Sequence, residues 1–148
     1  MVLLSSAREK HTTAVGEPNP DAVDYYSRIG VSPDADAETI ERRRKQADRR
    51  FSPMSSSPQG DEQRHMRINV ASNVLENVES RRRYDAFYDA FGPIEGTAVY
   101  DTVDESIADA VIDDGTLFAH LRGFVDVLGP IDGARSFETY YEELDPPI

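Results

Sequence analysis

The chain of 148 residues has no cysteine and no tryptophan, and only three of its residues are histidines. The lack of cysteine excludes disulfide bonds, thiolate metal sites and cysteine nucleophiles. His11, His65 and His120 lie far apart, so no two of them have metal-ligand spacing. Because no glycine-rich phosphate loop and no catalytic constellation is visible either, we expect a protein that is not an enzyme and holds no metal or cofactor.

Long hydrophobic runs are also missing. The apolar stretches are only a few residues long, which excludes a membrane-spanning helix. The first residues, MVLLSSAREKH, lack the basic region and the long apolar region of a signal peptide. We therefore expect a soluble, cytoplasmic protein that has no membrane partner. A chain of this length can bury about 70% of the surface that its unfolded form exposes, so a real core is possible.

Lysine is nearly absent, and the charge is strongly negative. Sixteen Lys and Arg residues against 28 Asp and Glu residues give −12, and only Lys10 and Lys45 are lysines. An acidic surface that uses arginine in place of lysine keeps a protein hydrated at high salt. We interpret the composition as that of a halophile; the alternative is an ordinary acidic cytosolic protein.

The acidic residues are concentrated near the C-terminus. Residues 1–91 have a net charge of −1, whereas residues 92–148 have two cations, thirteen anions and a net charge of −11. The change falls at Phe91-Gly92-Pro93, where glycine can cap a helix and proline cannot continue it. We therefore predict a disordered tail at residues 1–20, a module at residues 21–91 and an acidic extension at residues 92–148.

The periodicity of the module is helical throughout, which predicts an all-α fold. Short and long helices are expected at about 22–29, 37–51, 61–79 and 81–91, with a loop at residues 52–60 that contains two prolines, four serines and a glycine. The expected apolar face of the third helix consists of Met66, Val70, Val74, Leu75 and Val78, and that of the fourth of Tyr84, Phe87, Tyr88 and Phe91.

Two blocks of sequence resemble a known family. DYYSRIGVSPDADAETI at residues 24–40 and RINVASNVLENVESRRRYDAF at residues 67–87 are similar to the opening and closing parts of a J-domain, the helical module of DnaJ-type co-chaperones. The resemblance covers residues 21–91. It implies an antiparallel pair of long helices with a small helix at each end, and a protein partner that is a DnaK-type chaperone or another J-protein.

The loop between the long helices departs from the family pattern. J-domains carry His-Pro-Asp there, and the family spacing places this tripeptide on Ser52, Pro53 and Met54. Ser52 cannot carry a positive charge, and the thioether of Met54 is only a weak acceptor. The resemblance therefore implies a degenerate J-domain that lacks the contacts which trigger ATP hydrolysis by the chaperone.

The second helix is strongly basic, with six cations between Glu41 and Phe51. J-domains dock on the chaperone through such a face, so the predicted partner-binding residues are Arg42, Arg43, Lys45, Arg49 and Arg50. Arg44 stands where the family buries an aromatic residue. We expect it to lay its stem along the partner helix or to pair with an acid there; the alternative is a loosely packed helix with no special role.

Other residues receive simpler interpretations. We expect Tyr25 and Tyr26 to pack in the core and His65 to face solvent. The arginines of the second helix, together with Arg81-Arg82-Arg83, could bind phosphate groups. We do not favour nucleic-acid binding, because acidic residues interleave with these arginines and the chain is acidic overall.

The acidic extension is outside the resemblance. Apolar spacing predicts helices at about 104–112, 116–128 and 134–144, whereas residues 98–100 form a run too short to assign. Isolated amphipathic helices are unstable, so these must pack on the module, form a small cluster or bind a partner. We favour docking of residues 104–144 on the basic second helix.

Three functions remain open at this point. The leading hypothesis is an adaptor of the chaperone system that binds proteins without stimulating a DnaK-type ATPase. The second is an active co-chaperone that works through an altered loop. The third, an arginine-rich nucleic-acid-binding protein, is the least favoured of the three.

Overall fold

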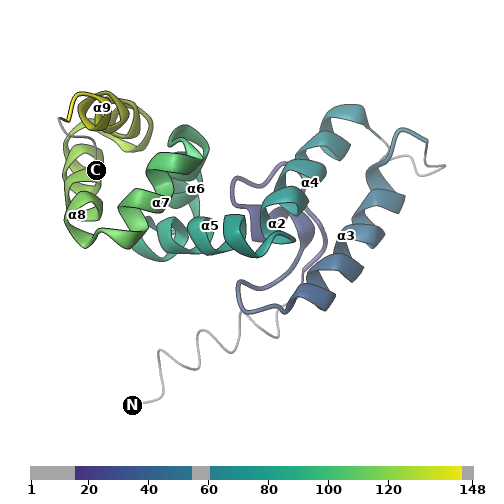
Figure 1. The fold of residues 1–148 in the computed structure, drawn as a ribbon. Helices are drawn as coiled ribbons and strands as arrows, with labels where there is room; N and C mark the ends of the chain where they lie inside the picture. The colour runs from purple at the N-terminus through teal and green to yellow at the C-terminus, as the bar shows by residue number, and fades with distance from the viewer. Residues whose placement is uncertain (1–15, 55–60, 145–148) are drawn as a thin grey trace, which may run out of the picture. The chain divides into compact units, whose positions relative to one another are not determined.

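The computed structural model describes residues 16–54 and 61–144, and these residues form helices and connections without a strand (Figure 1). This confirms the predicted all-α fold. The helices are α2 (Tyr25–Ile29), α3 (Ala37–Phe51), α4 (Glu62–Leu75), α5 (Val78–Phe91), α6 (Pro93–Thr102), α7 (Glu105–Asp113), α8 (Gly115–Leu128) and α9 (Pro130–Glu142). Among the described residues, no helix is both long and apolar enough to cross a membrane.

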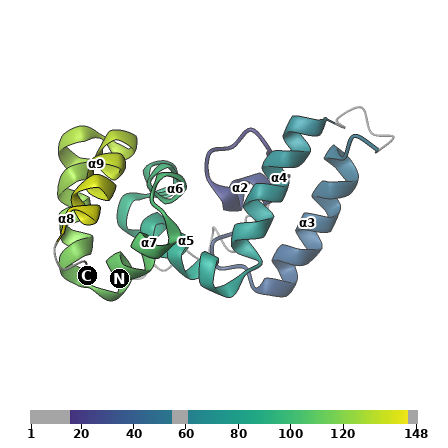
Figure 2. The ribbon, with the colours of Figure 1, turned by 45° about the horizontal axis from the view of Figure 1, so that its top comes forward.

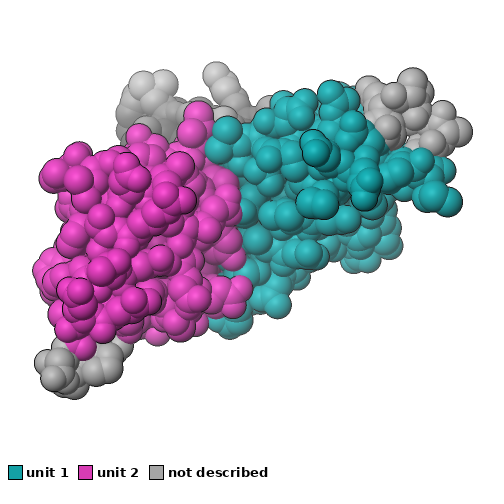
Figure 3. All heavy atoms as spheres, turned by 90° about the horizontal axis from the view of Figure 1, so that it is seen from above, with its two compact units in different colours: residues 1–81 teal, residues 82–148 magenta. Residues whose placement is uncertain are grey.

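The chain divides into two compact units, Met1–Arg81 and Arg82–Ile148, which Figure 3 shows in different colours. Helix α5 begins in the first unit and ends in the second. The composition changes ten residues later, at Gly92, but residues 82–91 contain two arginines and two aspartates, so the units still carry −1 and −11. The division at residues 20 and 91 stays a prediction, and most of the expected tail lies outside the described residues.

Helix α2 is short and is held by its two caps. The side chain of Asp24 accepts from the backbone N–H of Ser27 at 3.0 Å, and Gly30 ends the helix at φ 80°. A side chain at Gly30 would also collide with the backbone, because an ideal Cβ there lies 2.6 Å from the carbonyl oxygen of Gly16. Tyr25 and Tyr26 are buried, as expected, so even this five-residue helix contributes two aromatic rings to the core.

Helices α3 and α4 form the antiparallel hairpin of the first unit, and α2 packs beside α4 (Figures 1 and 2). Each long helix starts at an aspartate: Asp36 accepts from the N–H of Thr39, and Asp61 accepts from the N–H groups of Gln63 and Arg64. The hydrogen bond to Thr39 lowers the pKa of Asp36. Capping by a side-chain oxygen is worth about 1 kcal/mol per helix, so these aspartates specify where α3 and α4 begin.

The predicted third helix is wrong in two respects. It stops at Leu75, and a new helix begins at Val78, because the side chain of Asn77 accepts from the N–H groups of Glu79 and Ser80 and thereby caps α5. Most of the buried face is also a different one. Of the predicted face, Leu75 is buried and Val74 is half-buried, whereas Met66, Val70 and Val78 are 58%, 42% and 81% exposed. The other buried residues of α4 are Ile68, Ala71 and Ser72.

The second unit has a core of its own. Phe87 of α5 joins apolar side chains of the four following helices. Those buried side chains are Val99, Val103, Ile107, Ala108, Val111, Leu117, Leu121, Val125, Ala134 and Phe137. The apolar stripes of the last two helices therefore pack in a cluster of the second unit itself, apart from Leu128, which is exposed. The stripes are Leu117, Leu121, Phe124 and Leu128, and Phe137, Tyr140, Tyr141 and Leu144. The apolar reason for docking residues 104–144 on α3 no longer holds.

Proline and glycine have a different role in this unit from the one we expected. Pro93 and Pro130 each occupy the first turn of a helix, α6 and α9, directly after a glycine with positive φ. A proline fits this position because the N–H groups of the first turn have no partner inside the helix. The residues at 98–100 therefore belong to a complete helix, and the last helix begins four residues before its predicted start.

Candidate partner-binding site

The predicted basic residues of α3 lie on more than one face of the helix. Arg42, Lys45 and Arg49 are spaced three and four residues apart, so they share one face, and all three are exposed. Lys45 pairs with Glu41 at 3.1 Å, one turn earlier. Arg42 and Arg49 have no ion pair within the described part of the chain. We call Arg42, Lys45 and Arg49 the basic stripe.

Arg43 and Arg50 lie on a second face, which is partly covered by residues 16 and 17. The guanidinium of Arg43 donates to the carbonyl oxygen of Gly16, and that of Arg50 pairs with the carboxylate of Glu17. The hydrogen bond from Arg50 holds the pKa of Glu17 below its ordinary value. The structure therefore separates the five predicted residues into three on an open face, of which Lys45 pairs with Glu41, and two that contact residues 16 and 17.

Arg44 lies on the side of α3 that faces α4. Its guanidinium contacts Asp48 at 3.0 Å and Glu76, the C-cap of α4, at 3.2 Å. The hydrogen bond to Asp48 is the main reason why the pKa of Arg44 is raised. Asp48 also lies 3.1 Å from Nε2 of His65 in the first turn of α4. The predicted acid partner is thus present, whereas the expectation that His65 simply faces solvent is wrong.

These contacts sit beside a closely packed hairpin. Ala47 is fully buried and Phe51 is 4% exposed, and both pack with Ile68 of α4. Helix α3 is therefore not loosely packed, although it carries an arginine at position 44. An ion-pair network at its edge links α3 to residues near both ends of α4, at His65 and Glu76.

Residues 52–54, which the resemblance aligns with the family tripeptide, begin where α3 ends. Ser52 is the C-cap: its N–H donates to the carbonyl oxygen of Asp48 at 2.9 Å, and its hydroxyl accepts from the N–H of Met54 at 3.2 Å. Pro53 and Met54 form a turn, and Met54 is 93% exposed. The rest of the predicted loop, residues 55–60, lies outside the described residues. Ser52 and Met54 therefore offer a partner one hydroxyl and one thioether, and no charge.

Three arginines that the sequence did not assign to this region hold its loops in place. Arg28, Arg67 and Arg81 direct their guanidinium groups at backbone carbonyl oxygens rather than at acids alone. The acceptors are Ala22 and Val23 for Arg28, Pro20 and Ala22 for Arg67, and Pro33 and Ala35 for Arg81, at 2.6–3.2 Å. Arg81 also donates to the hydroxyl of Tyr26 at 3.0 Å. In the sequence, these three arginines are marked only by their helical spacing from residues that are buried.

Comparison with known proteins agrees with this geometry. Residues 24–85 match the family model of the DnaJ domain. The chaperone protein DnaJ of Lacticaseibacillus casei (strain BL23) is 37% identical over 73 residues, which are 49% of this chain and 19% of that protein. DnaJ of Trichormus variabilis (strain ATCC 29413 / PCC 7937) is 41% identical over 66 residues, 45% of this chain and 18% of that protein.

The first unit is therefore a helical hairpin of the J-domain class, and the chain carries a DnaJ domain at residues 24–85. The predicted resemblance is confirmed. The match extends over about a fifth of the length of the curated relatives, and residues 86–148 lie outside the family match. No solved structure matches the chain.

Proposed function

We propose that this protein is an adaptor of the chaperone system that uses its DnaJ domain to bind proteins without stimulating a DnaK-type ATPase. The observation that carries this proposal is the chemistry at residues 52–54. A histidine and an aspartate can make charge-assisted hydrogen bonds, which are roughly twice as strong as neutral ones. Ser52 and Met54 cannot make them, and the hydroxyl of Ser52 already accepts a hydrogen bond from the turn.

The basic stripe supports retention of a docking surface. Arg42 and Arg49 are exposed and have no ion pair in the part of the chain that the structure describes, so they remain available to an acidic partner surface. Surface charges of this kind set orientation and association rate more than affinity. The partner is a DnaK-type chaperone or another J-protein. An active co-chaperone with an altered loop is the alternative against which this proposal is tested.

Nucleic-acid binding receives less support from the contacts. Arg82 and Arg83 pair with Asp109 at 2.9 and 3.3 Å, and Arg81 donates to backbone carbonyl oxygens. The arginine run that motivated this hypothesis is therefore largely engaged within the protein. We also propose that the protein has no enzymatic activity, and that it works in the cytoplasm of a cell with a high salt content, as its composition indicates.

The decisive experiment measures single-turnover ATP hydrolysis by a DnaK-type chaperone in the presence of the full chain. A DnaJ protein that carries His-Pro-Asp is the positive control. We expect no acceleration by the native chain and a gain of acceleration in the double variant Ser52→His, Met54→Asp, because only the missing side chains are restored. Acceleration by the native chain that is lost in Pro53→Ala would instead establish the active co-chaperone.

Binding must be measured in parallel, because an adaptor that binds neither candidate partner is not an adaptor. The immobilised full chain is exposed to the DnaK-type chaperone and to an active J-protein in turn. We expect one of them to bind, and Arg42→Ala with Arg49→Ala to weaken that binding. Arg135→Ala, which removes an exposed arginine of the second unit, is the matched control and should have no effect. Failure of both proteins to bind contradicts the proposal.

A further inference from the structure

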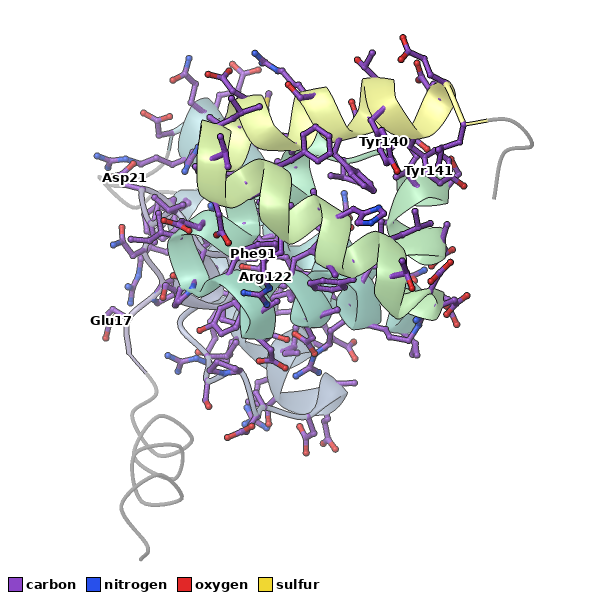
Figure 4. The ribbon with its side chains drawn as sticks, turned by 90° about the vertical axis from the view of Figure 1, so that its left-hand side faces the viewer. Glu17, Asp21, Phe91, Arg122, Tyr140 and Tyr141 are labelled. Carbon is purple, nitrogen blue, oxygen red and sulfur yellow. The ribbon has the colours of Figure 1, made fainter. Side chains whose placement is uncertain are left out.

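The second unit has an apolar groove along α8 and α9, and the buried core of the unit is complete without it. The groove has a volume of about 530 Å³ and is lined by residues that include His120, Gly123, Phe124, Val127, Leu128 and Tyr140. Figure 4 looks onto this side of the unit, where Tyr140 of α9 lies beside α8. The hydroxyl of Tyr140 lies 3.3 Å from Nδ1 of His120, so the two rings hold one wall of the groove in place.

The apolar side chains at one end of the groove are unusually exposed. Val127 is 82% exposed and Leu128 is 47% exposed, and both line the groove. The core-facing stripe of α8 is already complete without them, because Leu117, Leu121 and Val125 are buried. Single exposed apolar residues are common, but neighbouring ones that line a groove are typical of an interaction surface.

Gly123 indicates that the floor of the groove is open. It lies in the middle of α8, where glycine is less favourable than alanine, and an ideal Cβ at this position would meet nothing within 4 Å. Packing inside the unit therefore gives no reason for a glycine. At Gly133 of α9 the reason is clear, because a Cβ there would lie 2.6 Å from backbone atoms of α8. A missing side chain at Gly123 instead leaves room for atoms of a partner.

The charge around the groove identifies the kind of partner. The second unit has four arginines and fifteen acidic residues, a net charge of −11. Asp126 lies three residues after Gly123, and Glu143 lies three residues after Tyr140, and both acids are exposed. Arg122, the arginine of α8, is held over the ring of Phe91 at 5.1 Å (Figure 4). An apolar floor with acidic margins is complementary to a helix that has an apolar face flanked by Lys and Arg.

We infer that the α8/α9 groove binds a basic amphipathic helix of a partner protein. A second copy of this chain is a poor occupant, because it would bring two units of net charge −11 together. The groove lies in the unit outside the DnaJ match, so this binding is separate from any contact that the basic stripe makes. The inference stands whether or not the DnaJ domain stimulates an ATPase.

The test uses a model peptide because the natural partner is unidentified. A fluorescent helical peptide of leucine and lysine, with all leucines on one face, is titrated with the full chain at the lowest KCl concentration at which the chain is folded. A peptide with glutamate in place of lysine is the charge control. We expect the lysine peptide to bind, the glutamate peptide not to bind, and amide chemical-shift changes to be confined to α8 and α9.

Two variants locate the binding to the groove. Gly123→Leu fills the floor and Val127→Ser removes an exposed apolar contact, and each should weaken binding by about tenfold, as expected for one lost aliphatic contact. Ile94→Ser, at an apolar residue of α6 that is 65% exposed, is the matched control and should bind like the native chain. Neither Val127 nor Ile94 belongs to the core, so the variants remain folded.

Four results would overturn the inference. They are the absence of binding, equal binding of the glutamate peptide, an equal loss of affinity in Ile94→Ser, and sedimentation of the native chain as a dimer that Val127→Ser dissociates. The last result would show that the groove is occupied by a second copy of the chain.

Discussion

Alanine substitutions at Gly123 and at Gly133 should change the free energy of unfolding in opposite directions. Gly123 and Gly133 are ten residues apart, each inside a helix of the second unit. A Cβ at Gly123 would extend into open space, whereas a Cβ at Gly133 would lie 2.6 Å from both the carbonyl oxygen of Phe124 and Cα of Val125. Intrinsic helix propensity favours alanine at both positions equally, so any difference between the variants measures the packing of α9 on α8.

The magnitudes follow from these distances. Gly123→Ala should raise the free energy of unfolding by about 0.5–1 kcal/mol, the usual gain inside an exposed helix. Gly133→Ala gains the same amount but forces α8 and α9 apart, because the contacting atoms are backbone and cannot rotate away. Overpacking of this kind costs about 1–3 kcal/mol, which leaves a net loss of up to about 2.5 kcal/mol once the helix gain of about 0.5–1 kcal/mol is subtracted.

Thermal unfolding of the full chain measures both changes. For a unit of 60–100 residues, 1 kcal/mol corresponds to roughly 4–8 °C in the midpoint, and amide exchange in α8 assigns the transition to the second unit. Gly96→Ala is a second clashing variant, because its Cβ would lie 2.5 Å from the carbonyl oxygen of Phe87. If Gly133→Ala stabilised the unit as Gly123→Ala does, the close crossing of α8 and α9 would be refuted.

Three further predictions concern charge. Asp109→Asn should lower the free energy of unfolding by about 1–2 kcal/mol in urea titrations, and an unchanged midpoint contradicts this. The reason is that it removes a partner 3.3 Å from the nearly buried guanidinium of Arg83, while Glu105 remains at 3.6 Å. The pKa of Glu17 is below its ordinary value of 4.5 in the folded protein, so its contribution is complete above that value and is lost as the pH falls through the lowered pKa; amide exchange at residues 16–19 should accelerate there in the native chain and not in Glu17→Gln. The unfolding midpoint should rise between about 0.1 and 2 M KCl as the acidic residues are screened, and a flat profile refutes the halophile interpretation.

The sequence predicted the starts of α3 and α4 well because these starts have local causes. Asp36 and Asp61 are N-caps whose position is visible in the sequence, and Gly30 ends α2 at positive φ. The face of α4 was predicted less well. Met66 and Val70 are four residues apart and Ile68 and Ala71 are three apart; both spacings place two side chains on one face of a helix, so spacing alone does not say which pair faces α3.

The second unit shows the opposite pattern. Its later helices were predicted from periodicity within a few residues, but α6 was missed. Gly96 and Thr97 are weak helix formers, and they are helical because of contacts that no local pattern reveals: Gly96 allows α6 to approach α5, and Thr97 bonds to the hydroxyl of Tyr84 at 2.6 Å. The apolar argument for docking on α3 is lost for a related reason, because most side chains of the stripes pack against one another.

At the candidate site, the sequence could identify the basic helix, because it is a property of residue types at counted positions, and the resemblance predicted Ser52-Pro53-Met54 at the place of His-Pro-Asp. It could not show which arginines remain open. Arg43 and Arg50 differ from Arg42 and Arg49 through their contacts with the carbonyl oxygen of Gly16 and the carboxylate of Glu17, which lie against one face of α3. These contacts depend on tertiary structure, in particular on the close approach of residue 16 to Gly30.

The two candidate surfaces have opposite charge, and this bears on how an adaptor would work at high salt. The basic stripe consists of charged groups on an exposed helix, whereas the α8/α9 groove has an apolar floor and charge only at its margins. At about 1 M salt the Debye length falls to roughly 3 Å, so exposed charges lose most of their attraction, while burial of apolar surface is not weakened. Raising the KCl concentration should therefore weaken binding at the stripe much more than binding at the groove. In a salt-rich cell the second unit would then provide most of the affinity, and the DnaJ domain would mainly provide orientation.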